Sequence, residues 1–137
     1  MKGRVLAIDY GSRRVGVALS DPLRVLARAL TTLPNDGALL DALLDIIRTE
    51  EVRLIVVGMP YAPDGGMGKT AREVQRFIDA LSARTDVPVT PWDESQTTRQ
   101  AQHMLIEAGL KQSRRKQKLD EIAARIMLQE FLDGAGA

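Results

Sequence analysis

The chain has 137 residues, no cysteine and a formal net charge of +1. This length predicts one domain over residues 1–137, large enough to form a core without disulfides, and the lack of cysteine excludes a cysteine-based zinc site. No apolar run approaches the roughly 20 residues of a membrane-spanning helix, and no signal-peptide segment opens the chain, so we expect a cytoplasmic protein with no membrane partner.

The first two predicted strands form a hairpin. Residues 5–8 are a short apolar run that ends at Asp9, which predicts a strand buried on both faces. Residues 15–20 form a second apolar run, and the turn between the two is too short for a crossover helix, so the strands are expected to be antiparallel. A third strand is expected within residues 25–33.

A helix and a parallel strand follow. Residues 39–47 carry apolar side chains at helical spacing, after a turn in which Asn35 or Asp36 is the expected cap. Residues 54–58 are fully apolar and follow this helix, so they predict a strand parallel to the first one.

The remaining elements complete an α/β pattern. A loop rich in Gly and Pro leads to a helix at 71–81, and two prolines place a strand at 87–92 on a sheet edge. Helices are expected at 97–109 and at about 119–133. Three antiparallel strands followed by parallel crossovers predict a five-stranded mixed sheet with helices on both faces.

Acidic residues stand at the ends of two predicted strands and at the start of the last helix. Asp9 closes the first strand, Asp93 and Glu94 close the last strand, and Asp120 opens the helix. Ligands of an open α/β sheet collect beyond the carboxyl ends of its strands, where these side chains are expected to converge. Spacing does not decide between Asp93 and Glu94, because adjacent strand residues point to opposite faces.

Convergent carboxylates predict a metal site for phosphoryl transfer. Oxygen ligands without cysteine suit one or two ions of Mg²⁺ or Mn²⁺, and two ions about 4 Å apart stabilise the attacking and leaving oxygens. The alternative gives each acid a local role: Asp9 and the Asp93–Glu94 pair in turns, and Asp120 at a helix dipole.

The stretch from Gly65 to Thr70 resembles the end of a phosphate-binding P-loop. The full motif needs a glycine where this chain has Pro63, so we reject a Walker A loop. A loop whose backbone N–H groups hold a phosphate and a plain flexible loop remain as alternatives.

A run of basic residues between positions 111 and 118 precedes Asp120 in the sequence. Together with Arg13 and Arg14 near the first strand, this run is predicted to clamp phosphates of a nucleic acid, although a solvated loop is the alternative. His103 is the only histidine, so a Ser-His-Asp mechanism has no support. The basic run consists of Lys111, Arg114, Arg115, Lys116 and Lys118.

Four motifs in order along nearly the whole chain resemble the YqgF/RuvX family. The C-terminal motif, Lys118-Leu119-Asp120 with Ala123-Ala124 and Leu128-Gln129, comes after three others. These are Ile8-Asp9-Tyr10-Gly11 with Arg14-Val15-Gly16-Val17-Ala18, Gly58-Met59-Pro60 with Asp64-Gly65 and Gly68, and Asp93-Glu94 with Thr97-Thr98.

The resemblance implies an RNase H-like fold and a metal-dependent nuclease. Members of the family are described as Holliday junction resolvases and as nucleases that mature the 5′ end of 16S ribosomal RNA. Carried over by motif, the catalytic and metal-binding carboxylates are Asp9, Glu94 and Asp120. The chain departs from the family at Ser95-Gln96, where Arg-Leu is common, and at Gly66, where Ser is common.

We therefore expect a nuclease that processes the 5′ end of precursor 16S rRNA, with structured RNA as its partner. One alternative is a resolvase of four-way DNA junctions, which needs a dimer with two symmetric sites. Others are a non-catalytic nucleic-acid-binding protein, and an actin-like ATPase, which needs two such domains. The sequence leaves open whether the protein is a monomer or a homodimer.

Overall fold

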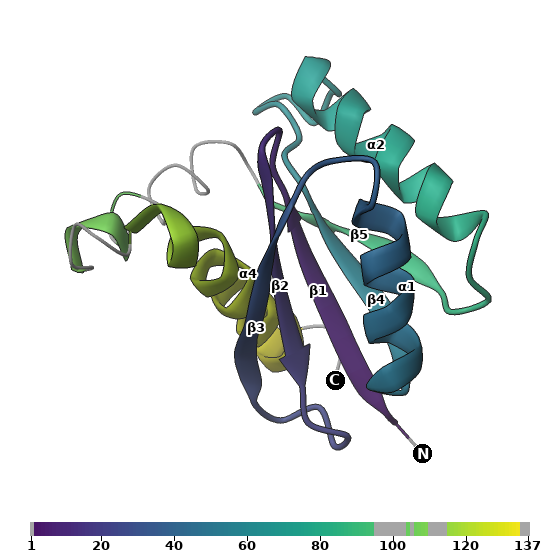
Figure 1. Cartoon of the computed structure of the whole chain (residues 1–137). Coiled ribbons are helices and arrows are strands. Elements are labelled where there is room, and N and C mark those ends of the chain that lie inside the picture. Colours follow the sequence, from purple (N-terminus) through teal and green to yellow (C-terminus); the bar gives the residue numbers. More distant parts are fainter. Residues whose placement is uncertain (1, 95–103, 105, 110–114, 135–137) are drawn as a thin grey trace.

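The computed structural model describes residues 2–94, 104, 106–109 and 115–134, with only the backbone of residues 115–118 (Figure 1). The strands form one mixed sheet in the order β3-β2-β1-β4-β5. The strands are β1 (Arg4–Tyr10), β2 (Arg14–Ser20), β3 (Ala27–Pro34), β4 (Val52–Met59) and β5 (Val89–Asp93), and the helices are α1 (Leu39–Thr49), α2 (Lys69–Ser82) and α4 (Arg115–Gly134).

The pairing of the strands confirms the predicted sheet. β1 and β2 are antiparallel, as are β2 and β3, whereas β4 runs parallel to both β1 and β5. β5 lies at an edge, as Pro88 and Pro91 predict, because a proline has no N–H to donate to a second neighbour. β1 therefore lies at the centre of the sheet.

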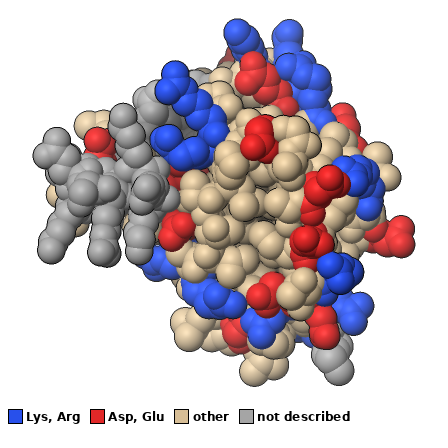
Figure 2. Space-filling model, in the orientation of Figure 1, with Lys and Arg blue, Asp and Glu red and all other residues tan. Residues whose placement is uncertain are grey.

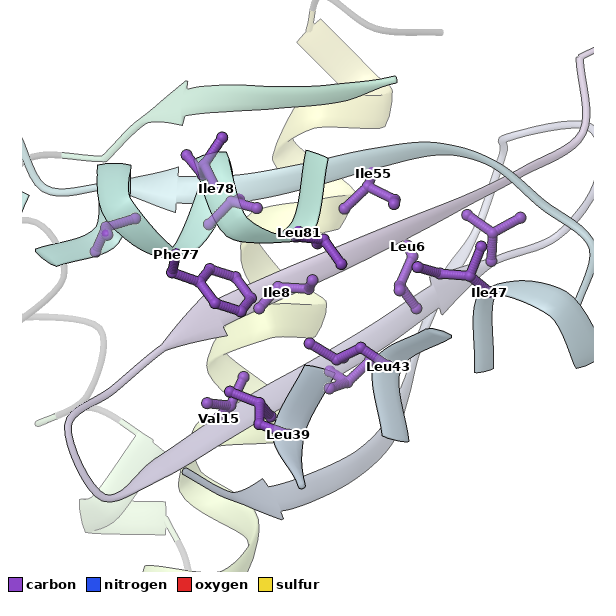
Figure 3. Close-up of a cluster of buried hydrophobic side chains, with 14 of the residues drawn as sticks. Leu6, Ile8, Val15, Leu39, Leu43, Ile47, Ile55, Phe77, Ile78 and Leu81 are labelled. Atoms are coloured by element: carbon purple, nitrogen blue, oxygen red, sulfur yellow. The ribbon is translucent and has the colours of Figure 1, made fainter. Parts of the chain in front are cut away.

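The two faces of the sheet bury alternate residues of β1. Leu6 and Ile8 point into a core with α1 and α2 (Figure 3), and Val5 and Ala7 point into a second core against α4. All four side chains are fully buried. Helices thus cover both faces, and α4 has one face of the sheet to itself among the described helices (Figure 1).

The start of α4 differs from the prediction. The helix begins at Arg115, four residues before Leu119, so the second half of the basic run lies in its first turn. Lys, Arg and Gln are good helix formers, which explains the earlier start. Asp120 consequently lies in the second turn, where the helix dipole does not account for it.

The cap of α1 also differs from the prediction. Ala38 is the N-cap residue and makes no side-chain cap hydrogen bond. Asp36, two residues before the N-cap, contributes instead: its side chain accepts a hydrogen bond from the N–H of Ala38 at 2.9 Å, and its carbonyl accepts one from the N–H of Leu39.

The predicted helix at 97–109 lies mostly outside the described residues. Within it, Met104 and residues 106–109 are helical. Among the helices that the structure describes, none combines the length and the apolar character that crossing a membrane requires.

Candidate active site

The site is built around Asp9, the second-last residue of β1. Its side chain is on the same face as Val5 and Ala7, because residues two apart in a strand share a face, so it points toward α4. Asp9 is 3% exposed. Burial of a carboxylate is costly unless the group is paired or holds a metal, which makes Asp9 a candidate site residue.

Glycines flank Asp9 on both neighbouring strands. Gly16 of β2 is its direct partner in the antiparallel pair. On the other side Ile8 pairs with Val57 of β4, so the next residue of β4, Gly58, lies beside Asp9. Both glycines face α4, and neither offers a side chain that would fill the space next to the carboxylate.

Glu94 comes over Gly58 from the end of β5. Its N–H donates a hydrogen bond of 2.9 Å to the carbonyl of Met59, and the residue is 8% exposed. A Cβ placed on Gly58 would lie 2.7 Å from Oε2 of Glu94 and 2.7 Å from Sδ of Met127 in α4. Glu94 therefore lies on the same face of the sheet as Asp9.

Asp93 is separated from this site. It is exposed and lines a different cleft, of about 330 Å³, together with Tyr61, Ala62, Pro63 and Gly65. Tyr61 packs against the core under α1 and α2. Spacing alone left the two acids equivalent, and the geometry separates them.

Asp120 approaches from α4 on the other side of Asp9. Its backbone lies directly over Gly16, where an added Cβ would overlap its carbonyl group. Its carboxylate accepts a hydrogen bond of 3.1 Å from Nε of Arg14, with the side chains 13% and 40% exposed, respectively. Arg14 was predicted as a phosphate contact, and here its guanidinium also neutralises part of the charge of Asp120.

The three carboxylates share one end of one face of the sheet without forming a compact ligand set. In the part of the chain that the structure describes, no group of three or more His, Cys, Asp or Glu side chains is close enough to hold a metal ion. The side chain of Glu94 and the backbone of Asp120 lie over the two glycines that flank Asp9, and the ion pair with Arg14 holds the carboxylate of Asp120.

The other residues predicted to contact nucleic acid are described only in part. Arg13 is exposed, and its carbonyl accepts a hydrogen bond of 2.8 Å from Asn35 N–H. Lys111 and Arg114 lie outside the described residues. Of the rest of the basic run, the structure describes the backbone in the first turn of α4: Arg115, Lys116 and Lys118.

In the glycine-rich loop after β4, two backbone N–H groups donate hydrogen bonds within the loop itself. Gly65 N–H donates to the carbonyl of Ala62 at 2.8 Å, and Gly66 N–H donates to Oδ1 of Asp64 at 2.8 Å. Gly65 has φ +84°, a conformation that glycine adopts readily. These two N–H groups are therefore engaged within the loop, which argues against a phosphate cradle at this point.

The two glycines and the Arg14–Asp120 pair were not predicted from the sequence. A glycine inside a strand signals a close approach by another part of the chain, and that signal was present at Gly16 and Gly58. The ion pair joins residues 106 positions apart, so no local pattern indicates it.

Comparison with solved structures defines the fold class of the protein. The structure of T. thermophilus RuvC in complex with a Holliday junction substrate is 16% identical, with a TM-score of 0.58 over 97% of this chain and 96% of that chain. A fowlpox virus resolvase in complex with Holliday junction DNA is 10% identical, with a TM-score of 0.56 over 94% and 98% of the two chains. At these identities the likeness shows the fold, which is the RNase H-like fold of the resolvases.

Sequence comparison then identifies the family. The family model described as "RuvX: Holliday junction resolvase" matches residues 3–134. A protein named "Putative pre-16S rRNA nuclease" from Roseiflexus sp. (strain RS-1) is 46% identical over 96% of this chain and 94% of its own length, and one with the same name from Pelotomaculum thermopropionicum is 38% identical over 97% and 88%. The chain belongs to the RuvX family.

Proposed function

We propose that this chain is a divalent-metal-dependent nuclease that cleaves precursor 16S rRNA near its 5′ end. The observation that carries the proposal is the arrangement of Asp9, Glu94 and Asp120 around the end of the central strand. Asp9 lies near the end of β1, Glu94 directly follows β5 and Asp120 lies in α4, and all three are on one face of the sheet. The name of the curated relatives supports the RNA substrate.

The donor set fits a hard divalent ion. Asp9, Glu94 and Asp120 supply only carboxylate oxygens, which Mg²⁺ and Mn²⁺ prefer. Asp9 and Glu94 are nearly buried, at 3% and 8% exposed, so a cation would offset their mutual repulsion. When bound, such an ion lowers the pKa of a bound water and polarises a phosphoryl oxygen.

The residues of the chain have distinct parts in the proposed mechanism. Asp9, near the end of the central strand, and Glu94 and Asp120 on either side of it would hold the ion, which would activate a water and polarise the phosphate. Arg14, which is paired with Asp120, would orient that carboxylate. The side chain of Arg14 is 40% exposed, so part of its guanidinium would remain available to a substrate phosphate.

A second candidate substrate is a four-way DNA junction. The description of the family and the two resolvase structures favour it. Resolution of a junction needs two nicks at symmetric positions, so this alternative also requires a homodimer.

A side-by-side cleavage assay tests the two substrates. Purified protein with Mn²⁺ or Mg²⁺ is incubated with a precursor 16S rRNA 5′ segment and with a synthetic four-way junction. We expect cleavage of the RNA that EDTA abolishes. Symmetric nicking of the junction by a dimer, without cleavage of the RNA, would replace the proposed substrate.

A further inference from the structure

The glycines beside Asp9 interrupt two strands that otherwise carry larger side chains on this face. The next residues of β2 and β4 that point toward α4 are Ala18 and Val56, which pack in the core under this helix. Glycine weakens a strand interior because it has no side chain to pack, so its presence at both sites requires a reason.

At Gly16 the reason is the backbone of α4. A Cβ added at Gly16 would overlap the carbonyl group of Asp120 and lie 2.8 Å from the nitrogen of Glu121. Backbone atoms cannot step aside without moving the helix. Gly16 therefore allows α4 to lie directly on β2 at the turn that carries Asp120.

At Gly58 the obstructing atoms are the ends of flexible side chains. A Cβ there would lie 2.7 Å from Oε2 of Glu94 and 2.7 Å from Sδ of Met127. Such contacts are too short, but both groups can move by rotation about their side-chain torsions. An alanine at position 58 would therefore displace the carboxylate of Glu94 while leaving the backbone in place.

We infer that Gly58 and Gly16 are positioning residues of the proposed metal site. Gly58 sets the distance of the Glu94 carboxylate from Asp9, and Gly16 sets the distance of Asp120. The inference rests on the proposed function, because it concerns the same three carboxylates. It adds that the gaps left by the glycines, and not the acids alone, determine whether one ion can be shared.

The test is Mn²⁺ binding to Gly58→Ala, measured by isothermal titration calorimetry without substrate. We expect the melting temperature to stay close to that of the wild type and the Mn²⁺ affinity to fall about 10-fold or more, as is usual when a residue that orients a metal ligand is changed. The matched control is Gly37→Ala, since a Cβ at Gly37 meets no described atom within 4 Å and should leave the affinity unchanged.

A double-mutant cycle shows whether Gly58 acts through Glu94. If it does, Gly58→Ala should cause no further loss of affinity in a Glu94→Gln background. Wild-type Mn²⁺ affinity in Gly58→Ala, combined with a loss in Glu94→Gln, would overturn the positioning role. Unchanged Mn²⁺ affinity in both Asp9→Asn and Glu94→Gln would instead overturn the proposed function.

If Gly58→Ala unfolds, the same substitution can be made in the Met127→Ala variant, where one of the two crowded groups is absent. The double variant Gly58→Ala/Met127→Ala should fold and should bind Mn²⁺ more weakly than Met127→Ala alone. Equal affinities would contradict the role of Gly58.

For Gly16, the position of α4 can be followed directly. Trp92, the single tryptophan of the chain, contacts Phe131 of α4 edge to face at 5.2 Å between ring centroids. Gly16→Ala should move α4 away from the sheet, which changes the fluorescence emission maximum of Trp92, and it should weaken Mn²⁺ binding. A folded Gly16→Ala protein with wild-type emission and affinity would refute the role of Gly16.

Discussion

Asp93 and Glu94 are neighbours in the chain with opposite surroundings. Glu94 is buried beside Gly58 and Met127, whereas Asp93 is exposed and lines a separate cleft. The alternation of side chains at the end of β5 produces this difference from two residues of similar chemistry.

Glu94→Gln should therefore reduce metal-dependent cleavage by about 100-fold or more, because it removes a charge that the metal requires while it keeps the shape of the side chain. The rate is measured under single-turnover conditions with saturating Mn²⁺. Asp93→Asn is the matched control and should retain most of the activity. Equal losses in the two variants would contradict the assignment of Glu94.

At the scale of elements, the turn between β2 and β3 depends on one carboxylate. Asp21 accepts hydrogen bonds from the N–H groups of Leu23, Val25 and Leu26 at 3.1, 2.8 and 2.8 Å. The hydrogen bond from Leu26 is the largest cause that lowers the pKa of Asp21 below its ordinary 3.8, and burial acts in the opposite direction. A carboxyl group with a lowered pKa stabilises the fold above its unfolded-state pKa and loses that contribution as pH falls through the folded-state value.

Asp21→Asn should accordingly have a lower melting temperature than the wild type at neutral pH, and the gap should close below pH 3.8 as the wild-type carboxylate is protonated. Thermal unfolding followed by circular dichroism at several pH values measures this gap. Asp45→Asn is a suitable control, because Asp45 forms an exposed ion pair with Arg48 within α1. A gap that does not change with pH would argue against the role of the charge.

The order and pairing of the strands were predictable because each strand has a local signal. The hairpin of β1 and β2 follows from two apolar runs joined by a short turn, and the edge position of β5 follows from Pro91 within it and Pro88 just before it. The start of α4 and the cap of α1 were not predictable, because basic residues suit both a loop and a helix and Ala38 carries no capping side chain.

The candidate site was predictable only in part, because some of its contacts have no local signal in the sequence. Acids at strand ends indicate an edge of the sheet where ligands collect, and this identified Asp9 and the Asp93–Glu94 pair. The close approach of Asp120 to Gly16 and its ion pair with Arg14 depend on the way α4 crosses β2. Contacts of this kind arise from packing between distant segments, which leaves no periodic signal in the sequence.

At the scale of the whole molecule, charge is balanced and dispersed. The formal net charge is +1, and on the face that Figure 2 shows, described side chains of both charges are interspersed around a largely uncharged centre. Such a surface attracts a polyanion only weakly at long range, so binding of nucleic acid must depend on local groups of cations.

Replacing Arg114, Arg115 and Lys116 together by Ala should weaken RNA binding and reduce the slope of log K against log[salt] by about 2, since each lost phosphate contact on a single strand removes about 0.7 from the slope. Fluorescence anisotropy at several salt concentrations measures the slope. An unchanged slope would return these residues to the role of a solvated surface.

The most direct test of the whole account is Mn²⁺ binding and cleavage of precursor 16S rRNA by the Asp9→Asn variant beside the wild type. Asp9 is central to the site, and the substitution removes its charge with almost no change in size. We expect a folded variant with the wild-type melting temperature or higher, weakened Mn²⁺ binding and no detectable cleavage. A folded Asp9→Asn protein that cleaves the RNA at the wild-type rate would contradict it.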